Sequence, residues 1–170
     1  MPPLQSIVLV DTMAIKLAHD FGCWNAIRKM FRLHSVPKCV EEATRANKDG
    51  AVLVRRSADD LAAELVLGNP DRLQVTTLTL QIGSQADLNE GEKHLLAYAL
   101  TLRGVWFLCG PDNGTVRAMQ ILSLLDRMVS FETVANASGH RFKKDLPYHF
   151  SERWLSSHRL EGLLQGSASL

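Results

Sequence analysis

The sequence predicts an α/β fold with a mostly parallel central sheet. Residues 7–10 and 105–109 form two short apolar runs, as is typical of strands covered by helices on both faces. Segments with helical spacing of apolar residues follow these runs, and strands that alternate with helices favour parallel pairing. The length of 170 residues fits one domain, whose core needs no disulfide or metal ion to fold.

The N-terminal third is expected to alternate strand and helix from the first apolar run onward. After the strand at residues 7–10, apolar side chains recur at helical spacing through residues 12–31, and Gly22 is expected to divide this stretch into two helices. Residues 34–36 favour a second short strand. Residues 40–47 then favour a helix with a charged outer face.

The middle of the chain mixes strand and helix signals. Residues 52–54 and 73–80 are strand-like, the second because its valine and threonine side chains favour a pleated surface. Residues 58–67 have helical spacing, and Gly68 opens a Gly-Asn-Pro sequence that is expected to end this helix.

The segment that begins at residue 90 carries the strongest helix signal. Residues 90–103 place their leucine and alanine side chains on one face, and Gly104 is expected to end the helix. The second apolar strand follows at residues 105–109. A turn at residues 111–114 then leads into a further helix at residues 116–125.

Charge and cysteine content exclude several classes of protein. Lys and Arg number 19 and Asp and Glu number 18, so a strongly basic nucleic-acid binder is not expected, although a near balance can conceal an acidic site within a mildly basic surface. The three cysteines form no CxxC pair, which argues against a disulfide or thiolate framework. The N-terminus does not resemble a signal peptide and no apolar run reaches 18 residues, which predicts a cytoplasmic protein without a membrane segment.

Acidic side chains occur where expected strands end and helices begin. They are Asp11, Glu41, Glu42, Glu92 and Asp112. Because ligands of parallel sheets bind at the carboxyl ends of the strands, these carboxylates are expected to converge there. Gathered carboxylates repel one another unless they share protons or a cation, and oxygen ligands without His or Cys favour Mg²⁺ or Mn²⁺. Such an ion can activate water against a phosphodiester bond.

Several of these acids also have a purely structural interpretation. Asp11 and Asp112 can cap the helices that follow them. Asn89 and Glu92 have the spacing of a capping box, which needs no metal ion. Capping explains each acid singly, but it does not explain why all of them occur at one class of junction.

Several stretches together resemble the motifs of PIN-domain ribonucleases. The likeness extends from about residue 7 to residue 132, and the order and spacing of its motifs are more specific than any one of them. The matching stretches are Val8-Leu9-Val10-Asp11-Thr12, the segment from Pro37 to Glu42, Leu88-Asn89-Glu90-Gly91-Glu92 with the alanine-rich helix after it, and the strand at 105–109 with Asp112, Arg117 and Ala118.

The resemblance implies a three-layer α/β/α sandwich in which residues 1–139 form an endoribonuclease domain that cleaves single-stranded RNA. Mg²⁺ or Mn²⁺ is the implied cofactor, with an activated water as the nucleophile. The implied catalytic and metal-binding residues are Asp11, Glu42, Glu92 and Asp112. Residues expected to contact the RNA are Thr12, Asn113 and Arg117.

One departure from the family leaves a second function open. Many members have an Asp-Asp pair where this chain has Asp112-Asn113, so the second acid is Glu41 or Glu42, of which Glu42 is favoured. The alternative function is a non-catalytic PIN-like module that binds RNA or a protein partner. Many small bacterial members are toxins held by an antitoxin protein, and dimers are common, so an antitoxin and a second copy are candidate partners.

Residues 140–170 are expected to form a basic-aromatic extension that packs on the domain, with a helix from Ser151. Its rings can pack on the core or stack on RNA bases, and packing is the favoured alternative. The rings are Phe142, Tyr148, Phe150 and Trp154.

Overall fold

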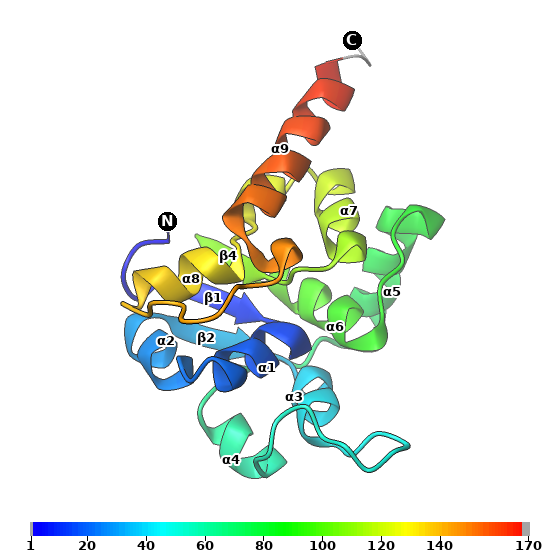
Figure 1. Ribbon diagram of the computed structural model, residues 1–170. Helices are drawn as coiled ribbons and strands as arrows, with labels where there is room; N and C mark the ends of the chain where they lie inside the picture. The colour runs from blue at the N-terminus through cyan, green and yellow to red at the C-terminus, as the bar shows by residue number, and fades with distance from the viewer. Residues whose placement is uncertain (1, 168–170) are drawn as a thin grey trace.

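The computed structural model describes residues 2–167 and is an α/β protein (Figure 1). Residues 168–170, the end of the expected extension, lie outside the described residues. In the described chain the strands are β1 (Ile7–Val10), β2 (Arg32–Ser35), β3 (Val66–Leu67) and β4 (Trp106–Cys109). The α-helices are α1 (Thr12–Asp20), α2 (Trp24–Met30), α3 (Pro37–Thr44), α4 (Ala58–Ala63), α5 (Arg72–Ile82), α6 (Glu90–Ala99), α7 (Asn113–Ile121), α8 (Phe131–Ala137) and α9 (Glu152–Ser167). Short 3₁₀ turns are η1 (Gly83–Gln85), η2 (Leu125–Arg127) and η3 (Tyr148–Phe150).

All pairings in the sheet are parallel, which confirms the expected α/β class. The strand order is β3-β2-β1-β4, so β1 is an interior strand. Val8 pairs with Leu33 of β2 and with Phe107 of β4, and its side chain is fully buried. Helices surround the sheet in a way that is compatible with a three-layer α/β/α sandwich (Figure 1).

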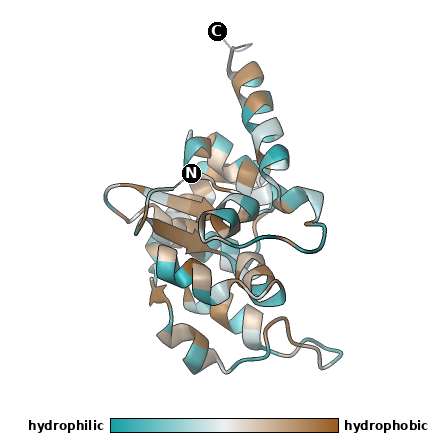
Figure 2. Cartoon of the chain, turned by 60° about the vertical axis from the view of Figure 1, so that its left-hand side comes forward, coloured by the Kyte–Doolittle hydropathy of each residue, from teal (hydrophilic) through white to brown (hydrophobic). Residues whose placement is uncertain are grey.

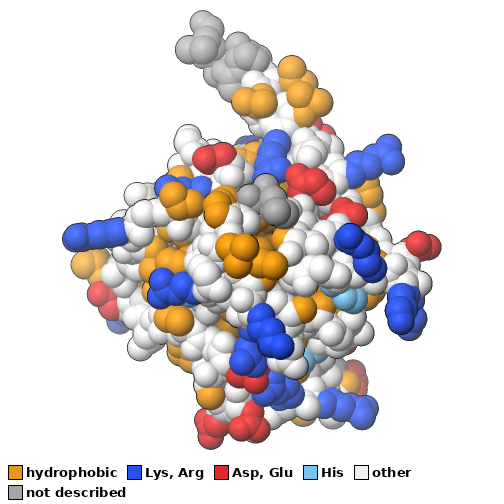
Figure 3. Space-filling model, turned by 90° about the vertical axis from the view of Figure 1, so that its left-hand side faces the viewer, with side chains coloured by type: hydrophobic (Ala, Val, Ile, Leu, Met, Phe, Trp, Pro, Cys, Tyr) orange, Lys and Arg blue, Asp and Glu red, His pale blue; other side chains and the backbone are white. Residues whose placement is uncertain are grey.

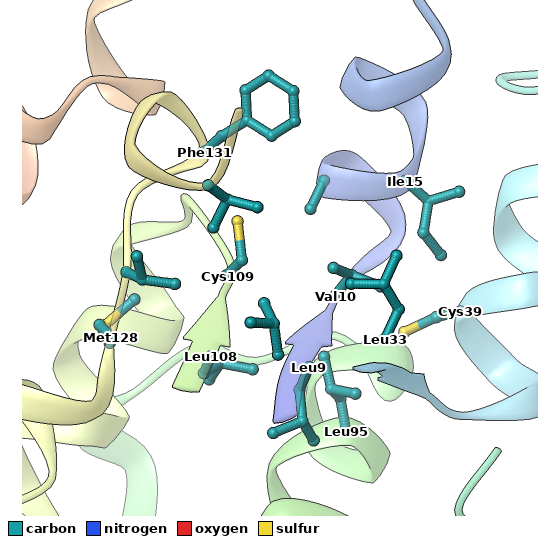
Figure 4. Close-up of a cluster of buried hydrophobic side chains, with 14 of the residues drawn as sticks. Leu9, Val10, Ile15, Leu33, Cys39, Leu95, Leu108, Cys109, Met128 and Phe131 are labelled. Atoms are coloured by element: carbon teal, nitrogen blue, oxygen red, sulfur yellow. The ribbon is translucent and has the colours of Figure 1, made fainter. Parts of the chain in front are cut away.

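The core lies between the sheet and its covering helices (Figure 4). Leu9 of β1 and Leu108 of β4 are fully buried, and Ile15 and Leu95 reach the same core from α1 and α6. The expected division of residues 12–31 is confirmed, because Gly22 adopts a positive φ of 68° between α1 and α2. The buried side chains of this core fix where each strand ends, and therefore where the polar residues after each strand begin.

The expectation of a strand at residues 73–80 is wrong, because this segment is helix α5. Asp71 and Gln74 form a capping box in which the Asp71 carboxylate accepts from the Gln74 N–H at 2.8 Å. The Thr79 hydroxyl donates to the Val75 carbonyl, also within the helix. Local capping therefore overrides the intrinsic strand preference of β-branched side chains.

Smaller corrections concern the segments on either side of α4. Residues 52–54 form no strand; the Val54 N–H donates to the Ala43 carbonyl instead. The helix expected over residues 58–67 stops at Ala63, and β3 follows because Val66 and Leu67 pair with the end of β2. The helix expected over residues 90–103 similarly ends at Ala99.

The chain after Gly139 returns to the body of the protein before α9 leaves it. The Glu152 N–H donates to the Glu132 carboxylate of α8 at 2.8 Å, and the Thr133 hydroxyl donates to Glu152. Figures 1 and 2 show that the outer part of α9 then extends away from the sheet and carries hydrophobic residues, among them the exposed Leu160. On the face drawn in Figure 3, basic and acidic side chains are interspersed. Within residues 2–167, no helix is long and apolar enough to cross a membrane.

Candidate functional site

The strand order places one switch point beside β1. The chain builds outward from β1 through β2 to β3 and then returns to place β4 on the other side of β1. Val10 pairs with Cys109, and the Asp11 N–H donates to the Cys109 carbonyl at 3.3 Å. Ligands of open parallel sheets bind where the strand order reverses in this way. Asp11 and Asp112, which follow β1 and β4, are therefore brought to the position where a ligand is expected.

Asp11 is the most enclosed acid of the site, with 4% of its surface exposed. It caps α1, and its Oδ1 accepts from the Ala14 N–H at 2.7 Å. Burial, and after it the charges of Glu92 and Asp112, raises the pKa of Asp11 to about 7, although the Ala14 N–H stabilises the charged form. The charged form of Asp11 is therefore unfavourable at neutral pH, because burial and the neighbouring carboxylates both oppose it.

Glu92 occupies the third position of α6 and completes the expected capping box. Its N–H donates to Asn89 Oδ1, and its Oε2 accepts from the Asn89 N–H, both at 2.9 Å. Burial first, and then the charges of Asp112 and Glu42, raises the pKa of Glu92 to about 7. Glu92 both caps α6 and lies among other carboxylates. The structural interpretation of this residue and the functional one therefore do not exclude each other.

Asp112 caps α7 from the loop after β4. Its Oδ2 accepts from the Gly114 N–H at 2.6 Å and from the Thr115 N–H at 3.3 Å. A Cβ at position 114 would lie 2.0 Å from the Asp87 carbonyl oxygen, so only glycine fits there. This close approach fixes the loop that carries Asp112.

The structure distinguishes the two adjacent glutamates of α3. Glu42 Oε2 accepts from the Thr12 hydroxyl at 2.8 Å, and a Cβ at Gly91 would lie 2.6 Å from the same oxygen. Glu42 therefore lies between the starts of α1 and α6, against Thr12 and Gly91, which adjoin Asp11 and Glu92 in the sequence. Glu41 instead forms ion pairs with Lys38 and Arg45 on its own helix, and 46% of its side chain is exposed.

Asp11, Glu92 and Asp112 line one cavity of about 350 Å³. The remaining lining residues are Met13, Asn89, Pro111, Asn113, His149, Phe150 and Trp154. A larger cavity of about 510 Å³, between α5 and α6, has no charged side chain in its lining. The switch-point cavity combines a concave shape with the buried Asp11 and the half-buried Glu92, both of raised pKa, a combination typical of functional sites.

The other expected site residues differ in whether they line this cavity. Asn113 lines it, and Thr12 holds Glu42 through the hydrogen bond already described. Arg117 is exposed on α7, and it is not among the described residues that line the cavity. Within the described part of the chain, no group of three or more His, Cys, Asp or Glu side chains is already arranged to hold a metal ion.

The sequence-based reasoning missed that the C-terminal extension reaches this cavity. His149, Phe150 and Trp154 line it, although they lie far along the chain from the carboxylates. The aromatic residues of the extension are the sequence feature that could have indicated this contact. Its return to the sheet edge depends on tertiary contacts such as that between Glu152 and Glu132, which no local pattern encodes.

Comparisons of the chain with known protein families, with characterised proteins and with solved structures find no match. A functional assignment therefore depends on the sequence motifs and on the geometry of the site. The fold and the carboxylate-lined cavity define an α/β protein with an acidic site at the switch point of a parallel sheet.

Proposed function

We propose that this protein is a Mg²⁺- or Mn²⁺-dependent endoribonuclease with a PIN-like α/β/α sandwich. The observation that carries the proposal is the convergence of Asp11, Glu92 and Asp112, from three separate elements, on one cavity at the switch point. Glu42 lies next to this group and contributes to the raised pKa of Glu92. These are the four acids that the motifs single out.

The state of the carboxylates favours a divalent cation. One oxygen of each is engaged in a helix cap, while Oε1 of Glu92 and Oδ1 of Asp112 accept no hydrogen bond from the described residues. Oxygen donors of this kind suit Mg²⁺ or Mn²⁺. Because the carboxylates repel one another without a cation, we expect them to draw closer together once one is bound.

The chain's own residues supply position and charge. Helix caps orient Asp11, Glu92 and Asp112, and Thr12 orients Glu42, so each carboxylate is held near the cavity before a substrate enters. A bound Mg²⁺ or Mn²⁺ would supply an activated water and would offset the charge of the phosphate. Hydrolysis would form a bond from the water oxygen to phosphorus and break the bond from phosphorus to the leaving oxygen of the RNA, with a proton lost from the water to solvent and a proton taken up by the leaving oxygen.

The test is cleavage of a labelled single-stranded RNA in the presence of Mn²⁺ by wild type and by Asp112→Asn. Removing one metal ligand is expected to lower the rate by about 100-fold or more, since metal and charge stabilisation contribute several kcal/mol. Asp49→Asn is the matched control, because Asp49 is exposed and does not line the cavity, and it should cleave as wild type does. Equal rates for wild type and Asp112→Asn would contradict the proposal.

A further inference from the structure

The cavity has two chemically different walls. One wall consists of Asp11, Glu92 and Asp112, and the other includes rings from the C-terminal extension. The acidic wall accounts for a cation and a phosphate, but it gives no role to the rings. A wall of aromatic and apolar side chains beside a phosphate position is the arrangement that holds an unpaired nucleobase, because every base has a π face.

Two of the three rings that line the cavity are largely buried and support the third. Phe150 and Trp154 are only 4% and 9% exposed, and Trp154 packs against His158 with ring centroids 4.6 Å apart. Of the three lining rings, His149 is the exposed one, and its ring centroid lies 3.9 Å from that of Phe150. Phe150 thus backs the His149 ring against the body of the protein.

The segment that carries His149 is a closed turn that is anchored on its C-terminal side. The Phe150 N–H donates to the Pro147 carbonyl at 3.0 Å, and the Ser151 N–H donates to the Tyr148 carbonyl at 3.0 Å, which closes η3. The start of α9 is held on α8 by the bond from the Glu152 N–H to Glu132. A stacking surface that is already ordered binds a base with a smaller loss of conformational entropy.

The other five histidines have partners elsewhere. His34 bonds to Tyr98, and the rings of His19 and His140 pack against Trp24 and Phe142. His94 lies near Glu90, and His158 contacts Trp154 and Glu161. None of these five lines the described cavity, so His149 is distinguished by its position.

We propose that His149, backed by Phe150, forms a subsite for the unpaired nucleobase next to the scissile phosphate. This inference rests on the proposed function, because the carboxylates must hold the divalent cation that would bind the phosphate. The cavity volume of about 350 Å³ falls at the small end of the range for ligand sites, which suits one nucleoside rather than a base pair. The C-terminal extension thereby becomes part of the substrate site.

The experiment compares an intact RNA with an abasic RNA. A 5′-labelled single-stranded RNA of mixed sequence is cleaved with Mn²⁺, the cleaved bond is mapped, and the same RNA is then made with an abasic ribose on either side of that bond. Stacking on one ring predicts that wild type cleaves one of the two abasic RNAs with a kcat/KM lower by about 5- to 150-fold.

Variants of His149 decide whether this ring is responsible. His149→Ala should lower kcat/KM on the intact RNA and add almost no further loss on the abasic RNA, while His149→Phe, which keeps a ring, should retain the discrimination. Tyr148→Ala is the matched control: Tyr148 is adjacent and 57% exposed but does not line the cavity, so the variant should behave as wild type.

The outcomes separate this inference from the proposed function. Equal cleavage of intact and abasic RNAs by wild type, or an equal effect of His149→Ala on both, would overturn the subsite and leave the ribonuclease in place. Absence of any Mn²⁺-dependent cleavage by wild type would overturn both.

Discussion

Replacing Asp11 with asparagine is expected to stabilise the protein in the absence of metal ions. Burial and the neighbouring acids raise the pKa of Asp11 to about 7, so the folded state must bear an unfavourable charge at higher pH. A rise from the ordinary value near 4 corresponds to at most about 4 kcal/mol, at about 1.4 kcal/mol for each pKa unit. Asparagine retains an oxygen that can accept from the Ala14 N–H, so the helix cap is preserved.

We expect a gain of about 1–3 kcal/mol in the free energy of unfolding at pH 8, since side chains and water relax around the charge in wild type. For a protein of this size, that gain raises Tm by about 2–10 °C. Between about pH 4 and pH 7 the folded state holds a proton on Asp11 that the unfolded state has released, so wild type loses stability as pH rises through this window. The advantage of Asp11→Asn should therefore be near zero at pH 4 and complete above pH 7.

The assay is thermal and urea unfolding of both proteins in chelator from pH 4 to pH 8, with Asp49→Asn as a control expected to stay within about 0.5 kcal/mol of wild type. Mn²⁺ at 100 times its Kd should offset most or all of this advantage, because a ligand that binds the folded state stabilises wild type by about 2.7 kcal/mol at that concentration. Loss of stability in Asp11→Asn at pH 8 without metal would refute the reasoning.

Other predictions concern residues around the site and one remote ion pair. Glu42→Gln should weaken Mn²⁺ affinity by about tenfold or more, whereas Glu41→Gln should change it by about twofold at most, as calorimetry would reveal. Gly91→Ala should also weaken Mn²⁺ binding, because a Cβ would lie 2.6 Å from Glu42 Oε2 and displace that carboxylate; unchanged binding would contradict the placement of Glu42. Glu64 accepts from Trp24 and Arg56, and hydrogen bonds from Arg56 first, then from Trp24, lower its pKa to about 2. Its contribution is therefore present above about pH 4.5 and lost as pH falls toward 2, so Glu64→Gln should cost about 1–2 kcal/mol in urea unfolding at pH 7 and much less at pH 3.

Strands β1 and β4 were predictable because their sequences are apolar at every position. Residues of β1 and β4 are apolar without interruption, and the two strands pair side by side in a parallel sheet, with β1 as an interior strand and β4 at its end. The segments that differ are those whose structure depends on distant partners. β3 consists of two residues that pair with β2, and α5 forms from a sequence rich in strand-favouring threonine because a capping box starts it.

The acidic part of the site could be located from the sequence for the same reason. Asp11 directly follows β1, and Asp112 follows β4 after two residues, so the parallel topology brings them to one edge. The choice between Glu41 and Glu42 depended on which side chain faces Thr12 and Gly91, which is a matter of helix rotation in the folded protein. The position of His149 in the cavity depends on where the extension returns to the sheet, which the structure shows and the sequence does not.

The central claim is that carboxylates from three separate elements share a divalent cation. Calorimetric titration of Mn²⁺ into wild type and into Asp112→Asn tests it most directly, since the binding of a cation requires neither RNA nor catalysis. We predict saturable uptake by wild type and an affinity lower by about tenfold or more for Asp112→Asn. No specific uptake by wild type, or the same affinity in the variant, would contradict the claim.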